Sequence, residues 1–457
     1  MDNNQTLLDI LVSLNVMLPI AAVLGHCGVK RIQIDHLATF TLGYLFYWIL
    51  PVAAGLAGAF ADPSRPGMSA WYSLFYTISN STLEWFLLLS LVCYFAFFCG
   101  SYWGSRIHLQ PSPRPGASAF DRRLLKPLLW LSAICLAGLS FVLRDQLFAG
   151  YTTGADPWTP DPLRSALGAL STILMILLLL DCTAKDRGDR SRGAFRRLLI
   201  SGFFLLYLLA SVLDVSMGSR MYMVSGILML CVFRSVFFSR FAAVNLLCLV
   251  GAGFLLAGLV GVWRMGRADY GLFENLAGEP MFTAMSLMHF LASDRLPLVR
   301  YPVLLLSEFL NLIPTFLFPG KMELFLRPED VGYVAFSPGG GLNSFFSFMI
   351  NFGVLGTIGV LFWLGFTMAV LKRKAGSPLL RVIYIMVSGW LGFTFFRDPF
   401  YVSITKCIVE FSTIVPFLIV LALNLITRAM AGSLTAAEAA ASGVGRAGST
   451  VTAGSYH

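Results

Sequence analysis

Charged residues are scarce in this chain of 457 residues. Asp, Glu, Lys and Arg make up 12% of it, whereas 57% is apolar and the mean hydropathy is +0.75. Soluble domains carry about a quarter charged residues, so the composition excludes an ordinary soluble protein. It favours a helical protein that crosses the membrane several times, and the length allows about ten to twelve spans of about 20 residues each.

Several common chemical motifs are also missing. The sequence has no GxxxxGK[ST], no acidic DxD loop, no HExxH and no GxSxG. These absences exclude the usual ATP-driven pump, the transferase that uses a metal-bound nucleotide sugar, and the simplest membrane protease or lipase. A GxGxxG at Gly443, Gly445 and Gly448 lacks the preceding strand and following helix of a dinucleotide site.

Cysteine is missing where a disulfide or a zinc site would be most useful. All eight cysteines lie within apolar segments or at their ends, and the longest polar connection has none. Cysteines in such positions are typical of helix packing. We therefore expect neither a metal site nor an organic cofactor.

Eleven uncharged apolar segments are long enough to form membrane helices. The sequence thus predicts an all-α polytopic protein with about eleven spans, within a range of 10–14. The segments cover residues 10–29, 37–60, 85–105, 127–143, 165–180, 198–213, 221–233, 241–263, 345–371, 382–396 and 411–427. A further apolar stretch at 301–319, interrupted by Glu308 and Pro314, is expected to be re-entrant or interfacial.

Basic residues concentrate in every second connection between these segments. Those connections and the C-terminal tail hold 21 Lys and Arg against 6 acidic residues, and the other side holds 12 against 18. Positive residues favour the cytoplasmic side of a membrane, so the N-terminus is predicted outside and the C-terminus inside. The net charge of +9 is then a sign of membrane topology and not of nucleic-acid binding.

The spacing of the segments divides the chain into four parts. Residues 1–263 and 345–427 hold the predicted spans, residues 264–344 form one large outer loop, and residues 428–457 form a disordered cytoplasmic tail rich in Ala, Gly, Ser and Thr. The outer loop carries eight carboxylates and many aromatic side chains. A loop of that length and composition is expected to be folded and functional.

Arginines at the outer ends of the spans are the main candidate binding groups. Guanidinium groups bind phosphate through two parallel hydrogen bonds, so several of them could hold a pyrophosphate without a metal ion. The alternative is that each one reaches the lipid headgroups or pairs with a neighbouring aspartate. The candidates are Arg144, Arg220, Arg264, Arg267 and Arg397.

Arg220 is the strongest of these candidates. The apolar run between it and Arg234 is thirteen residues, or about 20 Å of helix, which is shorter than the hydrocarbon core of about 30 Å. An arginine below the interface is by default a functional candidate. Asp214, six residues earlier, is a second candidate in the same site, although the two could also form a purely structural ion pair.

A general base is expected in the outer loop. His289 is the only histidine there, and its near-neutral pKa suits proton transfer. Glu274, Glu279 and Glu308 compete for that role. The alternative is a histidine that only packs, because its neighbours are mostly apolar.

A glycine-rich segment precedes the ninth predicted span. Gly339, Gly340, Gly341 and Asn343 lie just before a helix, where free backbone N–H groups could bind an anion or a sugar. A simple turn without a ligand is the equally good alternative.

These motifs together resemble those of the Wzy-type polymerases of oligosaccharide repeat units. The resemblance covers about residues 200–365 and rests on the following segments: Asp214–Arg220 (DVSMGSR), Leu312–Pro314, Phe318–Lys321, Gly339–Ser344 and Asn351–Gly356 (NFGVLG). It implies a GT-C-like protein of the bacterial inner membrane whose active site faces the periplasm.

The resemblance also implies an activity. Such enzymes transfer a growing glycan from its undecaprenyl pyrophosphate carrier to the sugar end of an incoming lipid-linked repeat. By position, Arg220 matches the motif arginine of the family, whereas the other arginines are inferred from placement alone. The lipid-linked oligosaccharide and the bilayer are the implied partners, and a chain-length regulator is left open as another.

Two other functions stay open. An O-antigen ligase would use the same donor but pass the chain to lipid A. A transporter of lipid-linked sugars would be expected to distribute charged residues along a path through the membrane, whereas the predicted spans are nearly free of charge.

Overall fold

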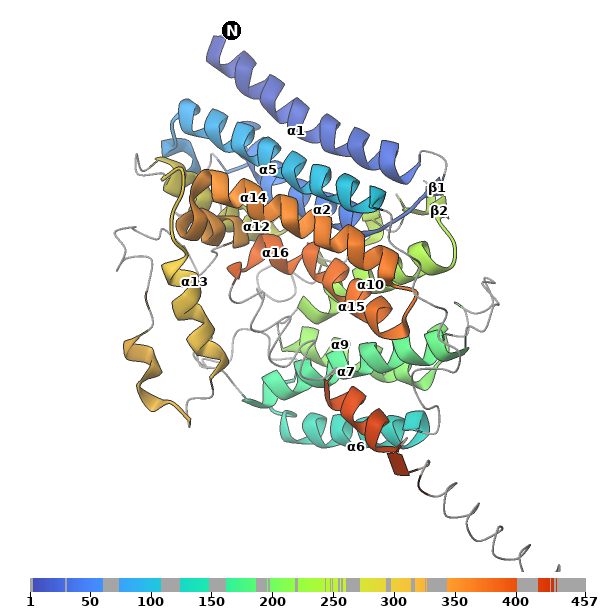
Figure 1. Cartoon of the computed structure of the whole chain (residues 1–457). Coiled ribbons are helices and arrows are strands. Elements are labelled where there is room, and N and C mark those ends of the chain that lie inside the picture. The colour runs from blue at the N-terminus through green and yellow to red at the C-terminus, as the bar shows by residue number, and fades with distance from the viewer. Residues whose placement is uncertain are drawn as a thin grey trace, which may run out of the picture.

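The computed structural model is a bundle of helices. It describes residues 3–28, 31–60, 74–107, 124–147, 162–185, 195, 198–217, 221–242, 244–246, 248, 250–253, 255, 258–259, 272–292, 297–313, 317–324, 326, 343–400, 418–427, 429–430 and 433. In Figure 1, α1, α5 and α14 follow one another from the top of the molecule, and α6 lies at the bottom.

The first half of the chain forms the longer peripheral helices and part of the core. Its elements are α1 (Asn3–Cys27), β1 (Arg31–Ile32), α2 (His36–Tyr44), η1 (Leu45–Ile49), α3 (Leu50–Leu56), η2 (Leu74–Thr77), α5 (Asn80–Arg106), α6 (Leu125–Val142), α7 (Pro162–Lys185) and α9 (Gly202–Ser216).

The second half supplies the remaining core helices and the short outer elements. They are α10 (Met221–Phe237), β2 (Phe241–Ala242), α12 (Leu272–Ala292), α13 (Val303–Glu308), η4 (Phe309–Leu312), η5 (Pro319–Glu323), α14 (Ser344–Lys374), α15 (Pro378–Leu391) and α16 (Thr394–Arg397).

Six helical segments in the described part of the chain are long and apolar enough to cross a membrane. They are Gln5–His26, His36–Leu56, Asn80–Arg106, Leu125–Val142, Ser344–Lys374 and Pro378–Arg397. Five shorter apolar helices occupy the other predicted segments, at Ala166–Cys182, Gly202–Ser216, Met221–Phe237, Val244–Gly253 and Leu418–Thr427. The chain is therefore helical and suited to a membrane, and the number of about eleven spans stays a prediction.

Exposed tryptophans support the membrane assignment. Trp85 and Trp103 lie near the two ends of α5 and are 66% and 65% exposed. Eighteen residues of helix separate them by about 27 Å, close to the thickness of the hydrocarbon core. Tryptophans at both membrane interfaces are typical of membrane proteins.

The core is formed by aromatic side chains from distant segments. Phe40 of α2 stacks on Phe97 of α5 with ring centres 3.8 Å apart, and Trp48 of η1 meets Phe345 of α14 at 3.7 Å. Glycines allow the backbones of α5 and α14 to approach closely: a Cβ atom on Gly104 would lie 2.6 Å from the Phe366 carbonyl oxygen. Close packing through small residues is the usual way in which membrane helices associate.

A polar cluster joins α1, α2 and α14 at one end of the bundle, which we call the basic end. Asp35 is fully buried, caps α2 by accepting from the Leu37 and Ala38 backbone N–H groups, and pairs with Lys372 at 2.6 Å. His26 lies 3.3 Å from the same carboxylate. Burial raises the pKa of Asp35, but the Lys372 ammonium and the His26 hydrogen bond bring it well below its usual range.

Five of the predicted cytoplasmic connections meet at this basic end. β1 pairs with β2, Arg373 donates to the Ile107 carbonyl, and the Arg234 guanidinium lies 5.6 Å from the ring centre of Phe195. Figure 1 shows β1 and β2 on the right and α13 on the left. The alternation of basic connections predicted from the sequence therefore corresponds to one face of the folded bundle.

We expect the Asp35→Asn substitution to lower the thermal stability of the purified protein. The neutral amide leaves Lys372 without its partner, at a cost on the order of 2–3 kcal/mol because Lys372 stays partly exposed. The matched control is Asp145→Asn, since Asp145 is 88% exposed and its pair with Arg144 is open to solvent. Equal melting temperatures for the two variants would show that the Asp35 pair does not hold the basic end together.

Candidate functional site

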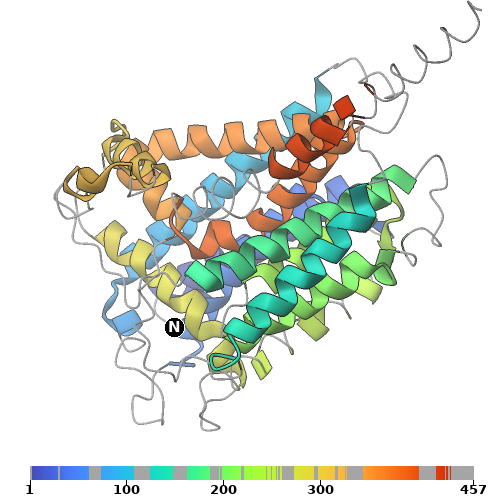
Figure 2. The same cartoon turned by 90° about the horizontal axis from the view of Figure 1, so that it is seen from below.

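The end of α14 opposite the basic end collects several of the predicted site residues, and we call it the distal end. Ser344 begins α14 there, whereas Lys372 lies in its last turn at the basic end. α12, α13 and α16 are among the elements that contact α14. Figure 2, seen from below, shows α13 and the short helices after it at the side of the bundle.

Asn343 fixes the start of α14. Its Oδ1 atom accepts from the Phe346 backbone N–H at 2.9 Å, and its Nδ2 atom donates to the Thr283 carbonyl of α12 at 2.9 Å. The side chain is fully buried. Asn343 therefore caps one helix and ties it to a second, and a role in substrate binding stays a prediction.

His289 lies on α12, two turns beyond Thr283. Its side chain is partly buried, and burial lowers its pKa below the usual 6.5. The next residue, Phe290, packs edge to face on Phe346 in the first turn of α14, with ring centres 4.9 Å apart. α12 therefore holds the predicted base close to the beginning of α14.

Arg397 ends α16 beside the same helix start. Its Nη1 atom lies 3.7 Å from Asp398 Oδ2, and its guanidinium carbon lies 5.7 Å from the ring centre of Phe393. The Ser344 hydroxyl donates to the Asp398 carbonyl at 3.0 Å. The structure thus brings Arg397 and Asn343 to the same end. It also contains the Arg397–Asp398 ion pair, which is the alternative to anion binding that the sequence left open.

The segment Asn351–Gly356 marks a break in α14. Gly353 has φ +71° and ψ −175°, so the helix is interrupted there. The Val354 and Leu355 N–H groups donate instead to the Pro297 and Leu298 carbonyls at 3.1 and 3.0 Å, and Arg300 N–H donates to Phe352. The segment 297–300 therefore replaces hydrogen bonds that the helix loses at the break.

Asn351 connects this break to α13. Its Oδ1 atom accepts from the Leu305 N–H, in the first turn of α13, at 2.7 Å, and its Nδ2 atom donates to Ser347 within α14. The first N–H groups of a helix have no partner within the helix, so Asn351 supplies one from outside. The hydrogen bond to α13 is a physical reason for the asparagine of the Asn351–Gly356 segment, and the positive φ angle at Gly353 is the reason for its glycine.

The predicted re-entrant segment 301–319 is observed as short pieces. α13, η4 and η5 follow one another, and Lys321 of η5 donates from Nζ to the Ile313 carbonyl at 2.6 Å. Tyr301 is 86% exposed and Lys321 is 8% exposed. The described parts of this segment, 301–313 and 317–319, are therefore folded, but α13, with six residues, is too short to cross a bilayer.

Asp214 lies on another side of the bundle, near the end of α9. It is buried, and it accepts a hydrogen bond from the Ser171 hydroxyl of α7 at 2.9 Å. The sequence did not identify Ser171 as a partner, because 43 residues separate the two and no local pattern connects α7 with α9. The proposed Asp214–Arg220 pair lies outside the described residues.

Arg144 is at the surface, away from these groups. It is 64% exposed, lies 3.6 Å from Asp145 and covers the Phe141 ring at 5.1 Å. These contacts fit the alternative to anion binding, in which the arginine pairs with its neighbours.

The other predicted site residues cannot be placed. Arg220, Arg264, Arg267, Gly339, Gly340 and Gly341 lie outside the described residues, and so do the side chains of Glu274 and Glu279 on α12. Among the residues whose positions are described, no cluster of three His, Cys, Asp or Glu side chains could hold a metal ion.

Comparison with known proteins does not assign a family. No family model, no curated protein and no solved structure matches the chain. The function must therefore be argued from the residues and their arrangement.

The break in α14 gives a sharp test of the distal end. We expect Gly353→Ala to lower the melting temperature, because its backbone conformation is open almost only to glycine and costs another residue about 1–3 kcal/mol. An added Cβ atom would also lie 2.5 Å from the Pro297 carbonyl oxygen. Gly359→Ala, on the same helix with nothing within 4 Å, is the control and should not reduce stability.

Amide hydrogen exchange shows which part of the structure Gly353→Ala destabilises. We expect the amides of Val354 and Leu355 to exchange faster in Gly353→Ala, since their acceptors are in the displaced segment. Unchanged exchange there would mean that the segment 297–300 is held in place by other contacts.

Proposed function

We propose that the chain is a polymerase of oligosaccharide repeat units linked to undecaprenyl pyrophosphate, acting in a bacterial inner membrane with its active site on the periplasmic side. About eleven spans and a GT-C-like arrangement form part of this proposal. The observation that carries it is that the elements bearing His289, Asn343 and Arg397 meet at the distal end. Asn343 bonds to Thr283 of α12, Phe290 of α12 packs on Phe346, and the Ser344 hydroxyl donates to the carbonyl of Asp398, next to Arg397.

The topology supports this orientation. Lys372 and Asp35 mark the basic end, which the positive-inside preference would place in the cytoplasm. The distal end is then on the outer side, where a lipid-linked repeat would be polymerised after its export. The large loop 264–344 would contact the glycan on that side.

The reaction is a glycosyl transfer with a pyrophosphate leaving group. A hydroxyl of the incoming repeat attacks the anomeric carbon of the growing chain, and the bond from that carbon to the lipid pyrophosphate oxygen breaks. The hydroxyl proton passes to a base, and the negative charge remains on the leaving pyrophosphate. Fixed cations stabilise that charge, and no metal ion is required.

The residues suit these roles. Arg397 is at the distal end, and Arg220, Arg264 and Arg267 are proposed to join it. His289 is the proposed base, since its lowered pKa keeps the imidazole neutral and able to accept a proton at neutral pH. Glu274 and Glu279 remain its competitors on the same helix.

A genetic experiment tests the function. We expect deletion of the gene to leave single repeats attached at the cell surface, with no longer chains on a polysaccharide gel. Reintroduced His289→Ala, Arg220→Ala and Arg397→Ala should each fail to restore long chains. The control is Arg240→Ala, an exposed residue near the basic end, which should restore them.

The same polysaccharide gel distinguishes a polymerase from a ligase or a transporter. Full-length polymer that accumulates on its lipid carrier would identify a ligase. Single repeats trapped on the cytoplasmic side would identify a transporter, and either result would overturn the proposal.

The pH dependence tests the base. For the purified protein we expect polymerisation to fall as the pH drops below 6.5 and through the lowered pKa of His289, because protonated imidazole cannot accept the proton. His289→Ala should lower the rate about 100-fold or more and abolish this acid limb. An unchanged acid limb in that variant would point to Glu274 or Glu279 as the base.

A further inference from the structure

The segment 297–324 exposes apolar side chains at the distal end of the bundle. Tyr301, Leu306 and Leu317 are 86%, 65% and 67% exposed. Four of the 28 residues in this part of the sequence are charged: Arg300, Glu308, Lys321 and Glu323. A contiguous apolar surface of this kind marks contact with another protein or with a membrane.

The helix α13 and the turn η4 carry an apolar stripe on their outer face. Val303, Leu306 and Phe309 follow one another at intervals of three residues and are all exposed. Leu304 and Ser307, on the other face, are buried against the rest of the protein. A helix that is apolar on both faces but buried on only one of them is suited to contact with lipid.

Backbone hydrogen bonds to α14 fix the level of the segment along the bundle. The Leu298 carbonyl accepts from the Leu355 N–H at 3.0 Å. Seventeen residues of helix separate Leu355 from Lys372 at the basic end, which corresponds to about 26 Å. The hydrocarbon core is about 30 Å thick, so the segment begins close to the boundary opposite the basic end.

The direction of α13 agrees with this level. Figure 1 shows α13 running across the direction of α14, and in Figure 2 α13 is seen nearly end-on while α14 extends across the view. With α14 across the membrane, α13 lies along its surface. The ends of short helices need hydrogen-bond partners, which water and headgroups supply at the interface but hydrocarbon does not. An interfacial position is therefore favoured over a re-entrant one.

The apolar surface of the segment continues onto a membrane helix. Leu298 and Val299 are 67% and 69% exposed, and Leu355, which bonds to Leu298, is 55% exposed. Trp363, farther along α14, is also exposed. Because α14 is long and apolar enough to cross a bilayer, its exposed side chains face lipid, and those of the segment extend the same surface.

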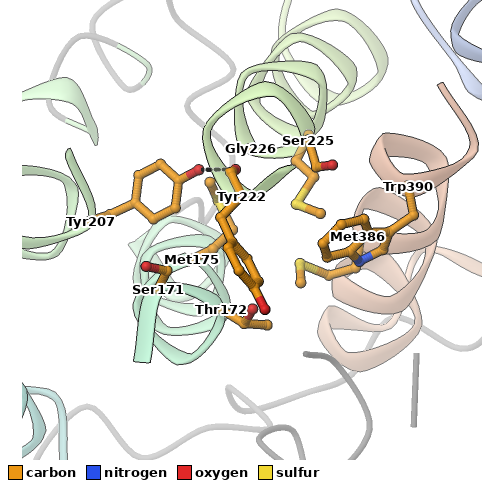
Figure 3. A pocket seen from close by; sticks show the side chains of 10 residues that line it. Ser171, Thr172, Met175, Tyr207, Tyr222, Ser225, Gly226, Met386 and Trp390 are labelled. Carbon is orange, nitrogen blue, oxygen red and sulfur yellow. Dashed lines mark hydrogen bonds between the residues drawn. The ribbon is translucent and has the colours of Figure 1, made fainter. Parts of the chain in front are cut away.

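The space inside the bundle between α7, α9, α10 and α15 does not offer such a contact. Met175, Tyr222 and Trp390 point toward one another there, and the rings of Tyr222 and Trp390 meet edge to face at 6.2 Å (Figure 3). The remaining cavity of about 10 Å³ has room for about one water molecule. Lipid chains are therefore excluded from this space and contact the outer surface.

We propose that the segment 297–324 lies in the interface of the leaflet on the distal side, where Val303, Leu306 and Phe309 contact the acyl chains of bilayer lipids. The partner is the lipid and not a second copy of the chain, because the surface is continuous with the lipid-facing side of α14. The inference is independent of the proposed polymerase activity, since it requires only that α14 crosses the membrane.

Photocrosslinking of the full-length protein tests the contact. The photoreactive residue p-benzoylphenylalanine replaces Leu306, and the protein is placed in nanodiscs of palmitoyl-oleoyl phosphatidylglycerol and phosphatidylethanolamine. After irradiation, mass spectrometry measures lipid bound to the peptide that contains residue 306. We expect about tenfold more adduct than at a position in water, because the side chain is surrounded by acyl chains.

Two other positions provide the references. The same residue in place of Trp363 on α14 marks a lipid-facing position, and its yield of lipid adduct should be similar to that at Leu306. In place of Asp145, which is 88% exposed and paired with Arg144 at the surface, it marks a position in water and should give little adduct. All three variants must elute as single species on size exclusion.

A second position guards against a local effect of the probe at Leu306. Tyr301 is the replacement, since its side chain is aromatic and more exposed. Lipid adducts at both positions no more abundant than at Asp145 overturn the proposal. A covalent dimer in place of the lipid adduct also overturns it and identifies a second copy as the partner. Neither result affects the chain-length phenotype, so the two proposals fail separately.

Discussion

A backbone N–H or C=O group that loses its helical partner needs another hydrogen-bond partner, and the distal end of α14 is organised by that constraint. The helix stops being regular at Gly353, which would leave N–H and C=O groups without partners. The segment at residues 297–300 pairs with them, and Asn351 caps the helix α13 that follows. One glycine and one asparagine thus connect the segment 297–308 of the large loop to α14.

The bundle has two chemically different ends. At the basic end, Asp35 is held ionised by Lys372 and joins three helices. At the distal end, neutral amides such as Asn343 hold the helices together. Arg397 is partly exposed there, whereas the Nε2 atom of His289 is buried. The guanidinium of Arg397 is thus the charged group of this framework that solvent partly reaches.

Three of the residues predicted from the sequence, His289, Asn343 and Arg397, lie on elements that meet at the distal end, but their contacts could not be predicted. A histidine in the outer loop and an asparagine before a helix are visible as local patterns, and both lie at the distal end. The bonds of Asn343 to Thr283 and of Asp214 to Ser171 join residues 60 and 43 positions apart. No periodicity encodes such a pair, because it depends on which helices lie side by side.

The sequence by itself determined the class of the protein, the position of its apolar helices and the shared location of its basic connections. These properties follow from local composition, since hydrophobicity and positive charge act on each segment separately. Only the tertiary structure decided that α14 breaks at Gly353 and that Asn351 supports α13. Packing produces these features, because each one depends on side chains and backbone groups that come close only when distant helices meet.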